Sequence, residues 1–188
     1  MDMCSGPLFR RMLVFTVPLI CSGMLQLFFN AADIIVVGKF SGEHALAAVG
    51  STSSLINLLL NLVIGISLGA SVIVGRNYGA KNKSSVRKSV HTAVAAAIWS
   101  GFIMLFVGVI LSPPILRLMG TPDDVIKLST LYMRIYFLGM PSMMLYNFGA
   151  SILRAAGDTK RPLYILAGSG IINIILNLIF VVGFNLSV

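Results

Sequence analysis

One carboxylate stands inside a stretch of sequence that otherwise suits the interior of a lipid bilayer. Asp33 lies in QLFFNAADIIVVG, residues 26–38, and follows Ser22, Gln26 and Asn30 at spacings of four, four and three residues. These spacings place the polar side chains on one face of a helix. Hydrocarbon offers no hydrogen bonds, so this face is expected to point toward protein or water. An ionisable group in such a place predicts a functional site.

Amide side chains in two later apolar stretches are expected near this acid. Asn173 and Asn177 are one turn apart, about 17 and 22 Å above Pro162 at 1.5 Å per residue. Asp33 precedes Lys39 by six residues, so it lies about 9 Å below the outer end of its helix. If the hydrocarbon is about 30 Å thick, Asp33 is about 21 Å above the level of Pro162. Asn177 and Asp33 can therefore meet. Asn147 is expected lower in the same cavity. Alternatively, the amides only join neighbouring helices, and Asp33 is a structural or interfacial acid.

The elements that position these residues follow from the composition. Of the 188 residues, 57% are apolar and 11% are charged, whereas a soluble domain carries about 25% charged residues. Five charge-free runs approach or exceed the ~20 residues that a transmembrane helix needs. We expect spans at 12–37, 45–75, 89–112, 125–153 and 162–185. The predicted fold is an all-α, polytopic transmembrane helix bundle of five spans, embedded in a lipid bilayer.

The net charge of +8 is explained by the membrane topology rather than by a nucleic-acid partner. Four basic residues lie on one predicted side, namely Lys39, Arg117, Lys127 and Arg134. Ten lie on the other side, namely Arg10, Arg11, Arg76, Lys81, Lys83, Arg87, Lys88, Arg154, Lys160 and Arg161. The positive-inside rule places the second side in the cytoplasm. We expect a multi-pass protein of the plasma (inner) membrane with a cytoplasmic N-terminus and no nucleic-acid partner.

Features within and between the spans argue against an enzyme. The connecting segments are too short for a soluble catalytic domain, and no metal or nucleotide motif appears, so no cofactor is expected. Pro18 and Pro141 lie inside predicted spans, where proline can bend a helix. Met140, Met143 and Met144 are expected to fill a core or face lipid, or alternatively to form an adaptable ligand surface. Five spans without a sixth suggest part of a larger bundle.

Four stretches of the chain resemble a known family. They are VPLICSGMLQLFFNAADIIVVGKFSGEHALAAVG, GRNYGAKN, RAAGDTKRP and INIILN, in this order along the sequence. Across nearly its whole length the chain resembles the N-terminal half of transporters of the multidrug and toxic compound extrusion (MATE) family. The chain would then form most of one six-helix lobe, with the C-terminal lobe absent.

The resemblance implies twelve helices in two lobes and the export of drug-like, often cationic compounds in exchange for protons or sodium ions. Asp33 matches the acid of the family's first helix, and Asn147 and Asn173 match amides that accompany it. Some members carry a second acid where this chain has Asn177. Oxygen from Asn173 or Asn177 could complete a sodium site at Asp33, because hard cations take oxygen ligands. The expected partners are small drug-like molecules and a missing lobe or another chain.

Two other functions are compatible with these features. Flippases of the same superfamily move lipid-linked saccharides, but they need cationic residues to meet pyrophosphate, and only Arg134 is a candidate here. A non-transporting scaffold or inactive membrane fragment would use its polar faces only for assembly.

Overall fold

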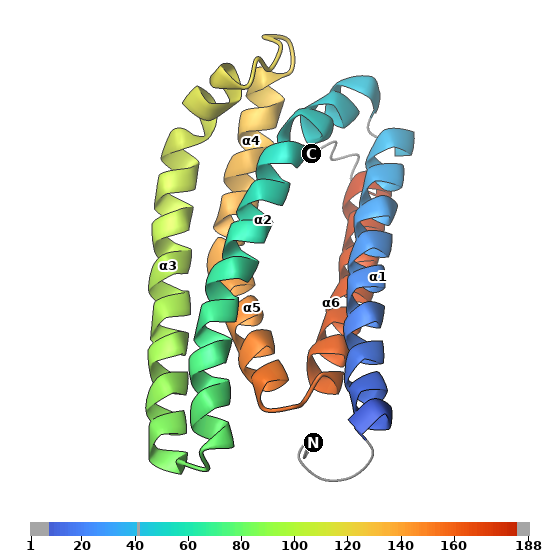
Figure 1. Ribbon diagram of the computed structural model, residues 1–188. Helices are drawn as coiled ribbons and strands as arrows, with labels where there is room; N and C mark the ends of the chain where they lie inside the picture. The colour runs from blue at the N-terminus through green and yellow to red at the C-terminus, as the bar shows by residue number, and fades with distance from the viewer. Residues whose placement is uncertain (1–7, 41, 184–188) are drawn as a thin grey trace.

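The computed structural model describes residues 8–40 and 42–183, and every regular element in these residues is helical (Figure 1). The predicted all-α membrane bundle is therefore confirmed. The helices are α1 (Leu8–Phe40), α2 (Gly42–Gly79), α3 (Lys83–Leu118), α4 (Ile126–Leu138), α5 (Met140–Ala155) and α6 (Lys160–Leu178), followed by the π-helical turn η1 (Ile179–Gly183). Cys4 and the end of the predicted span 162–185 lie outside the described residues.

The predicted count of five spans is slightly off. In the described chain four helices are long and apolar enough to cross a bilayer, namely α1, α2, α3 and α6. The expected span 125–153 is divided at Gly139 into α4 and α5, which follow one another along the bundle (Figure 1). Pro141 explains the break, because it has no N–H group to donate to the carbonyl of Phe137 and its ring crowds that turn. The N–H group of Gly139 instead donates to Tyr136 O at 3.0 Å.

The helices extend further than the predicted spans. Helix α2 continues to Gly79 and α3 begins at Lys83, where the side chain of Asn82 accepts a hydrogen bond from Ser85 N at 3.0 Å. Helix α3 passes through Pro113 and Pro114, beyond the end of the expected span 89–112, and its last turn buries Leu116 completely in the core. Helix ends do not mark membrane boundaries, so the spans themselves stay predictions.

Helices α2 to α5 pack together around an apolar core. Its two clusters are formed by Val63, Ala93, Ala97, Met144 and Phe148, and by Leu116, Met133, Phe137 and Met140. Met140 and Met144 are fully buried, which confirms the interpretation that they fill a core. Gly108 lets α3 approach α4 closely, since an added Cβ atom would overlap the ring of Phe137.

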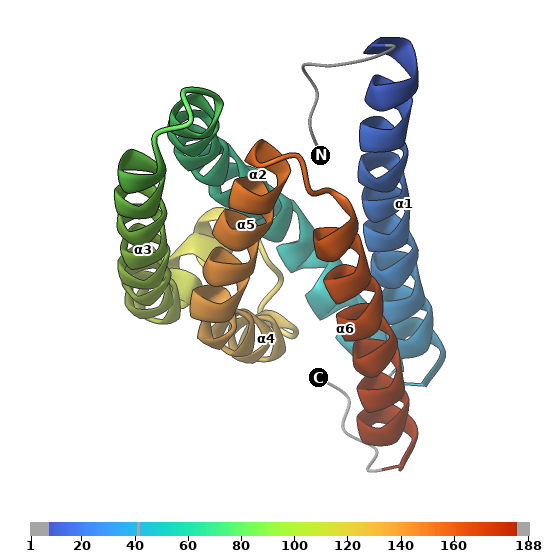
Figure 2. The same cartoon turned by 90° about the horizontal axis from the view of Figure 1, so that it is seen from below.

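Helices α1 and α6 form a separate pair that lies side by side in both views (Figures 1 and 2). Both begin at the lower end of the bundle in Figure 1, so they run parallel. The α2–α3 and α5–α6 connections lie at the same end. The segments with the most basic residues are thus at one end, as the charge pattern predicts.

The α5–α6 connection has a glycine and a proline at positions typical of helix ends. Gly157 follows α5 with φ of +83°, and its N–H group donates to Arg154 O at 2.9 Å. The N–H group of Asp158 closes the end of the helix on Leu153 O at 2.9 Å. Pro162 lies in the first turn of α6, where a missing N–H group costs no helical hydrogen bond.

Candidate functional site

The candidate site lies where α1 packs against α6. Gly170 of α6 has no side chain, and the ring of Phe29 of α1 occupies the space that a Cβ atom would take. This close contact brings the polar faces of the two parallel helices together further along their length. Asp33 lies one turn beyond Phe29, and Asn177 lies seven residues beyond Gly170.

Asp33 and Asn177 are in direct contact. The Nδ2 group of Asn177 donates a hydrogen bond to Asp33 Oδ1 at 2.5 Å. The same Nδ2 group lies 3.4 Å from Oδ1 of Asn173, its neighbour on α6. The meeting of Asp33 and Asn177, expected from counting residues along the helices, is therefore observed. The carboxylate oxygen of Asp33 and the amide oxygen of Asn173 thus both lie beside the NH₂ group of Asn177.

The negative charge of Asp33 has no basic partner within the described part of the chain. The ion pair found there joins Arg161 to Asp158, at 3.1 Å in the α5–α6 connection. Asp33 and Asn177 are half-buried, while Asn173 is exposed. A half-buried carboxylate that is hydrogen-bonded to an amide but not paired with a cation can accept a proton or a small cation.

The remaining predicted site residues do not touch Asp33. Gln26 and Asn30 lie on α1 with exposed side chains. Asn147, half-buried on α5, donates to the carbonyl of Met143 in its own helix at 2.9 Å rather than to Asp33. Ser22 is buried and donates to Pro18 O at 2.8 Å. The contact site therefore consists of Asp33, Asn173 and Asn177, and any role of the other amides stays a prediction.

Tyr132 of α4 is a neighbour of the site that the sequence analysis missed. This half-buried side chain lies within electrostatic range of the Asp33 carboxyl group. Tyr132 belongs to the group of α2 to α5, which contacts the α1–α6 pair through α2 and α5. The position of Tyr132 within the predicted span 125–153 was the sequence feature that could have indicated a place near Asp33. A tyrosine among apolar residues is not distinctive by itself.

The orientation of Asn177 bears on which cation the site can hold. Its NH₂ group faces Asp33, so its carbonyl oxygen faces away from the carboxylate. A sodium ion beside Asp33 needs oxygen ligands, and Asn177 supplies one only after its amide turns over. Asn173 Oδ1 needs no such change of its own amide to offer an oxygen. No group of three His, Cys, Asp or Glu residues suited to a metal ion occurs among the described residues.

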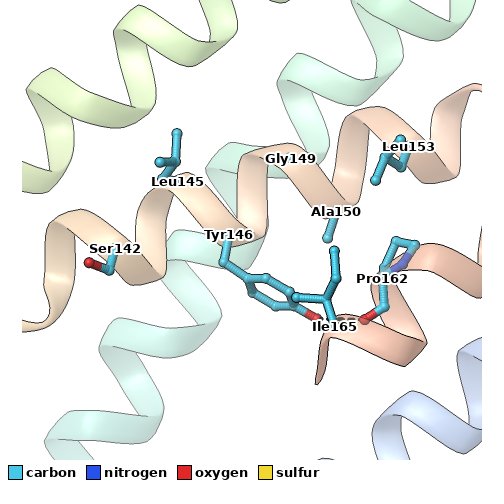
Figure 3. Close-up of a pocket in the computed structure, with 8 residues that line it drawn as sticks. All are labelled: Ser142, Leu145, Tyr146, Gly149, Ala150, Leu153, Pro162 and Ile165. Atoms are coloured by element: carbon cyan, nitrogen blue, oxygen red, sulfur yellow. Dashed lines mark hydrogen bonds between the residues drawn. The ribbon is translucent and has the colours of Figure 1, made fainter. Parts of the chain in front are cut away.

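A pocket of 370 Å³ lies apart from this site, between α5 and α6 (Figure 3). The hydroxyl of Tyr146 donates to Pro162 O across it at 3.3 Å. Its other lining residues are Ser142, Leu145, Gly149, Ala150, Leu153 and Ile165, and none of the predicted site residues is among them. Arg134, the residue considered for a saccharide flippase, is exposed on α4.

Comparison with known proteins gives consistent results. The chain is 40% identical over 174 residues to the probable multidrug resistance protein YoeA of Bacillus subtilis, covering 93% of this chain and 38% of YoeA. It is 25% identical to the multidrug export protein MepA of Staphylococcus aureus, covering 98% of this chain and 41% of MepA. The chain thus spans about two fifths of the length of these relatives.

Solved structures show the same fold. A crystal structure of a MATE protein in the bent conformation superposes with a TM-score of 0.89 at 24% identity, over 97% of this chain and 40% of that one. The outward-facing conformation of a multidrug resistance MATE family transporter gives a TM-score of 0.87. The family model of MatE matches residues 18–179. With most of its length matched by this model and 40% identity to YoeA, the chain belongs to the MatE family of multi-pass membrane transporters.

Proposed function

We propose that this chain forms most of the N-terminal lobe of a cation-coupled multidrug efflux antiporter. It would export drug-like, often cationic compounds in exchange for protons or sodium ions. The names of YoeA and MepA support multidrug export. The observation that carries the coupling role is the half-buried Asp33, held by Asn177 at 2.5 Å and unpaired with any basic side chain in the described residues.

The proposed exchange follows from having one negative charge at this place. Open to the outside, Asp33 takes up a proton or a sodium ion, and a cationic substrate loses its counter-charge and leaves. Open to the inside, the carboxylate loses that ion and attracts the next cationic substrate. One carboxylate cannot neutralise two cations at once, so the two species compete and exchange results rather than co-transport. Asn177 keeps the carboxylate oriented in the form without the coupling ion.

Transport by alternating access requires two bundles that rock about a central site. We therefore propose that a C-terminal lobe or another chain faces this one, in the plasma (inner) membrane with the N-terminus in the cytoplasm. A scaffold without transport activity would not need an unpaired acid where α1 meets α6.

The experiment replaces Asp33 by asparagine in the full-length transporter, with both lobes present, reconstituted in liposomes. The assay follows a fluorescent cationic dye while a proton gradient or a sodium gradient is imposed. Asp123→Asn is the matched control, because it removes the same charge from an exposed position at the opposite end of the bundle from the α5–α6 connection.

We expect Asp33→Asn to abolish gradient-driven dye movement and Asp123→Asn to retain it. The gradient that drives the control variant identifies the coupling ion. Undiminished transport by Asp33→Asn, at normal amounts of folded protein, would reject the role of this carboxylate.

A further inference from the structure

A basic hollow lies at the beginning of α3, far along the sequence from Asp33. Its volume is 680 Å³, and its lining residues are Ser84, Arg87, Lys88, His91 and Thr92. All five side chains are exposed. Helix α3 lies at the outer edge of the bundle in both views (Figures 1 and 2).

The positive charge of this hollow is not compensated. The sequence contains no Asp or Glu between Glu43 and Asp123, and no carboxylate among the described residues pairs with Arg87 or Lys88. The N-terminal end of a helix adds a partial positive charge, while the N–H groups of Ser85 and Val86 already donate to Asn82. The hollow therefore favours an anion, and hydroxyl groups of Ser84 and Thr92 can donate to it.

An exposed apolar face continues directly from the hollow along α3. Trp99 is 71% exposed, and Phe102, Ile103, Phe106 and Ile110 follow it with exposures from 46% to 69%. The opposite face of the helix, with Ala93, Ala97, Gly101 and Gly108, is the one packed in the bundle. A ligand that fits both parts carries an anionic head and an apolar tail.

We propose that the start of α3 binds an anionic phospholipid. The phosphate lies between Arg87, Lys88 and His91, and the acyl chains run along the face that carries Trp99 and Phe102. Free phosphate shares the chemistry of the head group, but it would leave the adjoining apolar face unused. This site is separate from Asp33 and does not depend on the proposed transport function.

Trp99 is the single tryptophan of the 188 residues and reports on the lipid beside it. It lies eight residues beyond His91, about 12 Å along the helix. The experiment measures quenching of Trp99 fluorescence in bilayers that contain brominated phosphatidylglycerol or brominated phosphatidylcholine. The ratio of the two gives the preference of the site for the anionic lipid.

The test compares Arg87→Gln/Lys88→Gln with Arg76→Gln/Lys81→Gln. Each pair removes one arginine and one lysine from exposed positions near the α2–α3 connection, but only the first pair lines the hollow. A basic residue near an anionic membrane surface strengthens binding by about fivefold. We therefore expect the first pair to lower the preference for phosphatidylglycerol at least fivefold and the second to leave it within twofold. Arg87→Lys/Lys88→Arg should keep the preference.

Each other outcome overturns the proposal. An equal loss in both double variants would mean that only the total charge matters. Absence of any preference for phosphatidylglycerol, together with binding of inorganic phosphate that Arg87→Gln/Lys88→Gln abolishes, would mean that the hollow holds free phosphate. Absence of quenching by either brominated lipid would mean that protein covers this face. Unchanged circular dichroism and gel filtration of both variants show that the comparison is between folded proteins.

Discussion

Replacing Gly170 by alanine puts a methyl group where the ring of Phe29 now lies. Phe29 is half-buried between α1 and α6, so the ring must move or the two helices must separate. Overpacking of this kind costs about 1–3 kcal/mol. Gly168→Ala is the matched control on the same helix, because its added Cβ atom meets nothing within 4 Å.

The control should be neutral or slightly stabilising, because alanine favours a helix over glycine by about 0.5–1 kcal/mol. Both variants gain this preference, so they should differ by the overpacking cost alone, about 1–3 kcal/mol in the free energy of unfolding. The measurement is reversible unfolding in mixed detergent micelles, followed by circular dichroism. Transport should also fall in Gly170→Ala, because separation of the helices lengthens the 2.5 Å contact between Asn177 and Asp33.

A double variant decides whether the steric explanation is correct. Phe29→Ala removes the ring, so adding Gly170→Ala to it should cost much less than adding Gly170→Ala to the native chain. The coupling energy between the two positions is expected to be about 1–3 kcal/mol. Equal stability of Gly170→Ala and Gly168→Ala, or a coupling near zero, would refute the packing of α1 on α6 described above.

Two further changes test the packing of α5. Met144→Ala removes a fully buried side chain and should lower the free energy of unfolding by about 2–5 kcal/mol, whereas Leu145→Ala, at a position 45% exposed, should cost far less in the same unfolding assay. Gly157→Ala forces an alanine to adopt φ of +83° and should cost about 1–2 kcal/mol. Similar costs at Met144 and Leu145, or no cost at Gly157, would contradict the burial or the turn.

The meeting of Asp33 with Asn177 could be predicted from the sequence because a helix rises by a constant amount per residue. Counting residues from Lys39 and from Pro162 was enough to place both side chains at one depth. The face of each helix was also predictable, since spacings of three and four keep side chains aligned. Such counting gives depth and face but not which helices become neighbours.

The features that counting missed depend on tertiary packing. Pro141 divided the expected fourth span, while Pro113 and Pro114 did not end α3, although all three lack an N–H group. Fully buried side chains follow both proline positions, Leu116 after Pro114 and Met144 after Pro141, so neither the proline nor the burial of the next turn determines by itself where a helix breaks. The contact between α1 and α6 likewise depends on Phe29 meeting Gly170, two residues 141 positions apart that share no local pattern.

The position of Asp33 on the α1–α6 pair connects stability to the proposed exchange. The pair stands beside the group of α2 to α5 and contacts it where α1 meets α2 and where α5 meets α6. A shift of α1 against α6 would change the 2.5 Å contact with Asn177 without disturbing the core around Met144. The carboxylate can therefore gain or lose its amide donor at the cost of rearranging one helix pair, which is the kind of local change that binding of a proton or sodium ion can drive.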